Sequence, residues 1–172
     1  MSGRGRTKAR LAALVAAAVL PACAAAAEPQ LPAAIAAPGQ IPIVTLHAEG
    51  AQIYECKDLG GKLTWAFREP IAALIQEGRT VGRHYTGPTW EDADGGAVIG
   101  KLAASAPGAT AGDVAWLRLD VVERRGSGIL SAATSVQRIN THGGALSGPC
   151  AERGALRAIP YSADYVFLRK GA

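Results

Sequence analysis

The segment HYTGPTWEDADGG, at residues 84–96, holds the densest group of side chains in this sequence that could take part in binding or catalysis. Its histidine, aromatic residues and carboxylates are His84, Tyr85, Trp90, Glu91, Asp92 and Asp94. A loop that presents a tryptophan among such polar groups suits a sugar, an aromatic compound, a cation or a small polar molecule. The segment is therefore the first candidate for a ligand-binding site.

The same segment also fits a purely structural loop. Thr86-Gly87-Pro88 and Asp94-Gly95 are typical of turns. In this interpretation His84 bonds the backbone, Trp90 closes one end of the core, and the carboxylates of Asp92 and Asp94 cap turns. Both interpretations remain open from the sequence.

A second polar cluster lies in QRINTHGG, at residues 137–144, where a predicted strand ends. It contributes Arg138, Asn140 and His142. If both clusters lie at the same end of a sheet, they form one cleft, which the sequence alone does not show.

Metal and cofactor motifs fail on spacing. DADGG is similar to part of a calcium loop, but Gly96, Ala97 and Ala103 occupy positions where that loop needs a ligand, a glycine and a glutamate. Zinc ligation by His84, Asp94 and His142 lacks the usual histidine spacings. We therefore predict no metal and no cofactor.

Catalysis is an alternative to ligand binding. A small extracytoplasmic hydrolase would use His84 with Asp94, or an acid–base pair drawn from the carboxylates of residues 91–94, whose separation is not given by the sequence. The chain has no G-x-S-x-G nucleophile motif. A structural envelope protein without a ligand is the third alternative.

The elements that must position these residues read as short strands. Alternating or glycine-bounded runs recur as AQIYECK, KLTWAFR, TVGRHY, GAVIGKL, DVAWLRLDVVE, GILSAATSVQRIN and YSADYVFLRK. We predict an all-β fold, mainly an antiparallel β-sandwich or barrel. The run EPIAALIQEG also fits one short helix near residues 70–77.

Aromatic residues at alternate strand positions are predicted to belong to the core rather than to contact a ligand. They are Tyr54, Trp65, Phe67, Trp116, Tyr165 and Phe167.

The first residues predict export. Basic residues, the apolar run LAALVAAAVL and small residues form a signal peptide at residues 1–27, too short to remain as a membrane span. LPAC, ending at Cys23, is similar to a lipobox and leaves a lipid anchor as an alternative. Residues 28–44 form a Pro/Ala-rich lead-in, and residues 45–172 form a single β-rich domain. The expected location is periplasmic or extracellular.

Charge argues against nucleic acid as a partner. The chain has 18 basic and 14 acidic residues, and residues 1–27 hold four of the basic ones and no acidic one, which leaves 14 of each sign. Nucleic-acid binding needs a clustered excess of Lys and Arg. The expected partner is a small molecule or an envelope or extracellular component. Outside the signal peptide, Cys56 and Cys150 are an even pair, which predicts a disulfide in an oxidising compartment.

The series QIYEC, W-x-F-x-x-P-x-A-x-L, VGRHYTGPTWE, QRINT-x-GG and YSADYVF resembles an uncharacterised family of secreted bacterial and fungal proteins, domain of unknown function 3455. The resemblance covers residues 50–168. It implies an exported single domain with no established activity. Some fungal members carry the label malate dehydrogenase, but RRGSGILS has Ser131 where a dinucleotide-binding turn needs its third glycine. We predict that the protein is not an NAD-dependent dehydrogenase.

Overall fold

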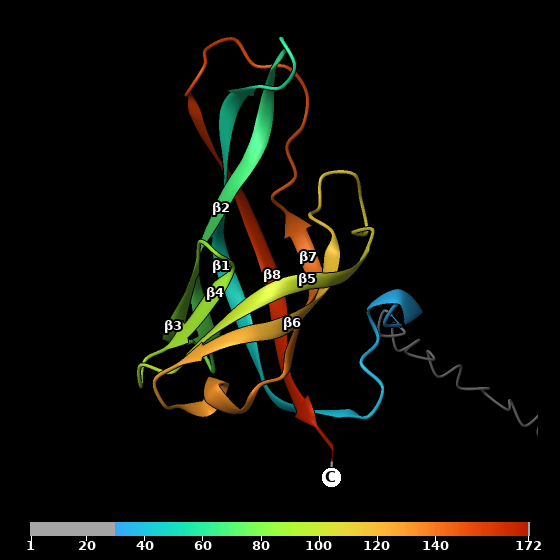
Figure 1. Ribbon diagram of the computed structural model, residues 1–172, viewed down its shortest axis with the longest axis vertical. Helices are drawn as coiled ribbons and strands as arrows, with labels where there is room; N and C mark the ends of the chain where they lie inside the picture. The colour runs from blue at the N-terminus through green and yellow to red at the C-terminus, as the bar shows by residue number, and fades with distance from the viewer. Residues whose placement is uncertain (1–29, 172) are drawn as a thin grey trace, which may run out of the picture. The chain divides into compact units, whose positions relative to one another are not determined.

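Alternating side chains along eight antiparallel strands close the chain into a barrel (Figure 1). The structure is a computed structural model that describes residues 30–171. Each strand pairs with the next, and β1 also pairs with β8, which closes the sheet on itself. The all-β prediction is confirmed, and of the two predicted architectures the barrel is the one that forms.

The strands and two short 3-10 helices follow one another along the described chain. Their bounds are η1 (Ala33–Ile35), β1 (Gln40–Asp58), β2 (Leu63–Gln76), β3 (Arg79–Tyr85), β4 (Thr89–Asp92), β5 (Ala97–Ala106), β6 (Trp116–Arg125), η2 (Ile129–Ala132), β7 (Ser135–Gly143) and β8 (Leu156–Lys170).

The barrel interior is built from every second residue, because successive side chains of a strand point to opposite faces. On β1, Leu46 and Ala48 are buried, and on β8 the inward residues include Ala163, Tyr165 and Phe167. These residues belong to the main apolar cluster, together with Trp90 of β4. The predicted alternation is therefore confirmed for these strands.

The short helix that the sequence allowed near residues 70–77 is not formed. This segment belongs to β2, which pairs with β1 from Leu63 to Ile75. Around Pro70 the strand pairs with β1 alone, since the ladder to β3 begins only at Ala72. Proline is tolerated at such an edge because no hydrogen bond is required from its nitrogen on the open side.

The lead-in predicted at residues 28–44 is in part integral to the domain. Ile35 of η1 is fully buried against Ala106 and Trp116 on the outer face of the barrel. The first strand begins at Gln40, so the predicted domain start at residue 45 is too late. A single apolar anchor among prolines and alanines gives no periodic pattern, which explains the error.

The predicted disulfide is confirmed and joins Cys56, in β1, to Cys150, in the connection between β7 and β8. The backbone of the same connection bonds to the hairpin of β1 and β2, through Trp65 N–H to Gly148 and Cys150 N–H to Leu63. The connection is therefore fixed to this hairpin by covalent and hydrogen bonds.

The predicted signal peptide at residues 1–27 and the alternative lipid anchor at Cys23 lie outside the described residues. From residue 30 to residue 171, no helix is long and apolar enough to cross a membrane.

Candidate ligand-binding cavity

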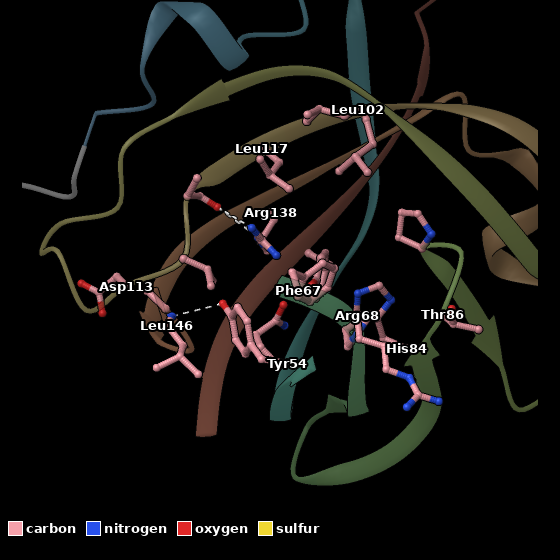
Figure 2. A pocket seen from close by; sticks show the side chains of 18 of the residues that line it. Tyr54, Phe67, Arg68, His84, Thr86, Leu102, Asp113, Leu117, Arg138 and Leu146 are labelled. Atoms are coloured by element: carbon pink, nitrogen blue, oxygen red, sulfur yellow. Dashed lines mark hydrogen bonds between the residues drawn. The ribbon is translucent and has the colours of Figure 1, made fainter. Parts of the chain in front are cut away.

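A cavity of about 780 Å³ lies within the barrel, and each of the eight strands contributes at least one residue to its wall (Figure 2). Phe67 of β2 and Leu102 of β5 line it while remaining 52% and 58% exposed, so they mark its opening to solvent. Cavities of this volume are of the size that holds a small organic molecule.

Aromatic and aliphatic side chains form much of the wall. Tyr54 and Phe67 meet edge to face with ring centroids 5.8 Å apart, and Trp90 meets Tyr165 in the same way at 5.3 Å. Leu117 adds an aliphatic surface from β6. Such a wall favours a ligand with an apolar or aromatic body.

His84 is held as a neutral imidazole beside the cavity. Its Nδ1 lies 2.8 Å from the carbonyl oxygen of Thr89, and because a carbonyl only accepts, Nδ1 carries the proton. The ring stacks on Trp90 at a centroid distance of 4.6 Å. Burial lowers the pKa of His84 to about 3, against a weaker opposing effect of the bond to Thr89. His84 therefore carries no charge at neutral pH.

Arg138 brings a positive charge into the barrel. In the ladder it lies opposite Tyr165, which is buried in the interior, so both side chains are on the inward face. Its Nε and Nη2 donate to the carbonyl oxygen of Ala115 at 3.0 and 2.8 Å. None of the ion pairs within residues 30–171 includes Arg138. The cation has no carboxylate partner in the described part of the chain.

The charge of Arg138 affects the pKa of two tyrosine hydroxyl groups near it. Burial raises the pKa of Tyr54 and that of Tyr165, and Arg138 partly opposes both rises by favouring the ionised form. Figure 2 shows Arg138 and Tyr54 on the same side of the cavity, each reaching it from its own strand. The guanidinium therefore has two effects on the cavity wall: it lowers the pKa of these tyrosines, and it holds the carbonyl group of Ala115 by hydrogen bonds.

Two fully buried N–H donors of the wall lack an acceptor. Gln52 Nε2 and Trp90 Nε1 have no hydrogen-bond partner among the described residues, and both side chains are 1% exposed. Buried polar groups nearly always have a partner in native proteins, because leaving one unpaired costs free energy. Both nitrogens lie within the wall itself, with almost no accessible surface toward the cavity.

The segment at residues 84–96 is divided between two faces of the barrel. His84 and Trp90 line the cavity. Trp90 is 1% exposed, so it is a wall of the interior and not the surface platform that the sequence suggested. On the other face, Glu91 accepts hydrogen bonds from Tyr85 at 2.6 Å and from Arg83 at 2.8 Å. Alternation along β3 and β4 causes this division.

Asp92 and Asp94 take part in a turn and not in the cavity. Asp92 Oδ1 accepts from the N–H groups of Asp94 and Gly96 at 3.1 and 2.8 Å, and its Oδ2 accepts from Leu130 N–H at 3.3 Å. Asp94 is exposed in the turn between β4 and β5, whereas His84 bonds Thr89, at the other end of β4. The structure does not bring together the His84 and Asp94 pair that the hydrolase alternative required.

From the second predicted cluster, only Arg138 reaches the cavity. Asn140 donates to Asp164 at 2.9 Å, and His142 is exposed; neither lines the cavity. His84 and Trp90 of the first predicted cluster and Arg138 of the second therefore line the same cavity.

Several residues that line the cavity carry no sign of this role in the sequence, because their alternating positions are those of core residues. Tyr54 and Tyr165 are buried, as predicted for core residues, and they also line the cavity, whereas Phe67, predicted as a core residue too, is more than half exposed at its opening. Gln52 carried the one available signal, since it is a polar residue on the inward face of an alternating strand.

Metal ligands do not gather anywhere in residues 30–171: no group of three or more His, Cys, Asp and Glu side chains there is placed to hold an ion.

A family model described as "Protein of unknown function (DUF3455)" matches residues 36–169. The matched range includes every residue that lines the cavity. Searches of curated proteins and of solved structures give no match.

Proposed function

The chain belongs to this family of proteins of unknown function, and from the cavity of its barrel we propose that it is a binding module for a small organic molecule with an apolar or aromatic body. The observation that carries the proposal is a cavity of about 780 Å³ that is lined by aromatic side chains and by Arg138. Eight-stranded barrels have an interior that holds either packed side chains or one small ligand.

We also propose that the module acts outside the cytoplasm. The Cys56–Cys150 disulfide supports this location, because disulfides persist mainly in oxidising compartments. The ligand would then be a compound of the periplasm or of the extracellular medium.

The opening of the cavity gives a direct test by site-directed substitution. We expect the purified protein, with its disulfide intact, to bind the neutral fluorescent probe N-phenyl-1-naphthylamine. The F67A substitution removes a ring from the opening and should weaken binding about three- to tenfold, as expected for the loss of part of an apolar contact. Probe titrations followed by fluorescence measure the effect.

I71A is the matched control for this test. Ile71 lies on the same strand as Phe67 and is similarly exposed, 56% against 52%, but does not line the cavity. Its affinity for the probe should equal that of the wild type. A protein that binds no probe, or two variants with equal affinities, would support a purely structural role instead.

A further inference from the structure

Arg138 is the charged hydrogen-bond donor that β7 places on the inward face of the barrel, in the wall of the cavity. Its guanidinium donates to the carbonyl oxygen of Ala115 through Nε and Nη2, and none of the ion pairs within residues 30–171 includes it. The hydroxyl of Tyr54 is already used, since it donates to Gly144 at 2.8 Å and accepts from Leu146 N–H at 3.3 Å. A ligand that pairs with this guanidinium must therefore carry an acceptor group at one end.

Three charged side chains line the cavity, the guanidinium groups of Arg68 and Arg138 and the carboxylate of Asp113. Arg68 lies at the opening but is exposed and pairs with Glu69 at 3.1 Å. The carboxylate of Asp113 accepts from Gly143 N–H and from Thr110, and these hydrogen bonds lower its pKa. Arg138 is half-buried on the inward face of β7, and it forms no ion pair with Asp113 or with any other carboxylate of residues 30–171. The guanidinium of Arg138 can therefore pair with one carboxylate of a ligand.

We infer that the ligand is an amphipathic monocarboxylate whose carboxylate pairs with Arg138 and whose apolar body lies along Tyr54, Leu117 and Phe67 toward the opening. The inference rests on the proposed function, because it names the ligand class of the same cavity. Arginine suits this role, since its planar fork of donors matches the two oxygens of a carboxylate.

The inference is tested with decanoate and decan-1-ol, which share a chain and differ in the head group. Both compete with N-phenyl-1-naphthylamine for the purified protein. Decanoate should bind at least about tenfold more tightly than the alcohol, because hydrogen bonds to a charged group are the stronger kind. In the R138M variant the ratio of the two affinities should fall to about one, with the alcohol still bound.

The ratio within one variant separates head-group recognition from damage to the fold, because both ligands meet the same protein. R68M is the matched control: it removes the other arginine of the cavity wall, and the preference for decanoate should persist. Loss of the preference in R68M but not in R138M would place the head group at the opening and overturn the inference.

If R138M does not fold, measurements on the wild type alone still test whether the carboxylate pairs with Arg138. A carboxylate paired inside the barrel should keep its preference in about 0.5 M salt, whereas a pair at the exposed Arg68 should lose it through screening. Equal binding of acid and alcohol would overturn the inference and leave the proposed function standing. Absence of binding by the probe and by both ligands would overturn the proposed function itself.

Discussion

The imidazole of His84 is buried so completely that folding and protonation oppose each other. Burial lowers its pKa from 6.5 to about 3 in the folded protein. As the pH falls below 6.5, the unfolded chain binds a proton that the folded chain does not, so the stabilisation present above pH 6.5 is lost progressively toward pH 3. His84 should therefore contribute a slope of up to about 1.4 kcal/mol of unfolding free energy per pH unit.

Urea denaturation of wild type and H84Q at pH 7, 6, 5 and 4 measures this contribution. The substitution should lower stability at pH 7 and make the curve against pH shallower than that of the wild type. H142Q is the control, because His142 is exposed, and its curve should run parallel to that of the wild type. If the stability curve of H84Q against pH ran parallel to that of the wild type, the lowered pKa of His84 would be contradicted.

At the scale of residues, chemical type alone singled out His84, Trp90 and Arg138, which the barrel does bring together. Type alone also singled out Glu91 and Asp94, which lie elsewhere. The difference depends on which face of a short strand each side chain occupies. Turns at both ends of β4 set that register, and they are difficult to place to within one residue.

At the scale of elements, Asp92 connects the turn after β4 to η2 through three backbone N–H groups. D92A leaves these donors without their acceptor in a largely buried place and should lower the unfolding free energy by about 2–3 kcal/mol. D94A, at an exposed position of the same turn, should change it by less than about 0.5 kcal/mol. Denaturation midpoints compare the variants, and equal values would refute the connecting role of Asp92.

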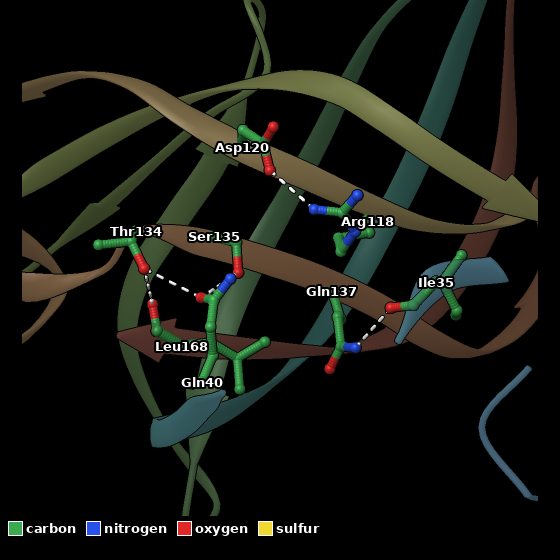
Figure 3. A network of polar contacts seen from close by, with 8 residues as sticks. All are labelled: Ile35, Gln40, Arg118, Asp120, Thr134, Ser135, Gln137 and Leu168. Carbon is green, nitrogen blue, oxygen red and sulfur yellow. Dashed lines mark hydrogen bonds and ion pairs between the residues drawn. The ribbon is translucent and has the colours of Figure 1, made fainter. Parts of the chain in front are cut away.

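The strands were predictable from period-two patterns, but their ends and one ambiguous run were not. The apolar pattern of EPIAALIQEG fits a helix as well as a strand. The segment forms a strand because it pairs with β1 and β3. The N-terminal boundary was missed for a similar reason. Figure 3 shows that polar contacts hold this segment: Gln40 accepts from Ser135 at 2.8 Å, and Gln137 donates to Ile35 at 2.7 Å. Such long-range contacts leave no local pattern.

At the scale of the whole molecule, the disulfide constrains the unfolded chain across 94 residues. Its removal in the C56A/C150A variant should lower the unfolding free energy by about 4–5 kcal/mol, the entropy that a cross-link of this span removes from the unfolded state. Urea denaturation of the variant and of the wild type measures the change, and the wild type unfolded in reductant is the control. A variant as stable as the oxidised wild type would contradict the prediction.

The cavity inside the barrel is the property of the whole molecule that is hardest to predict from the sequence. Inward side chains alternate in the same way around a packed core and around a cavity, so Tyr54 and Phe67 read as core residues. The volume left between the strands depends on how the sheet closes, which is set by strand number and stagger together.

The pairing of β1 with β8, from Gln40 with Lys170 to Glu55 with Leu156, also fixes the order in which the protein can be made. Strand β1 is synthesised first and β8 last. Because the two must pair, nearly the whole chain must leave the ribosome before the barrel can close. Folding that depends on such distant partners is slow. The barrel therefore closes only after β8 has been synthesised, and until then β1 lacks one of its two neighbouring strands.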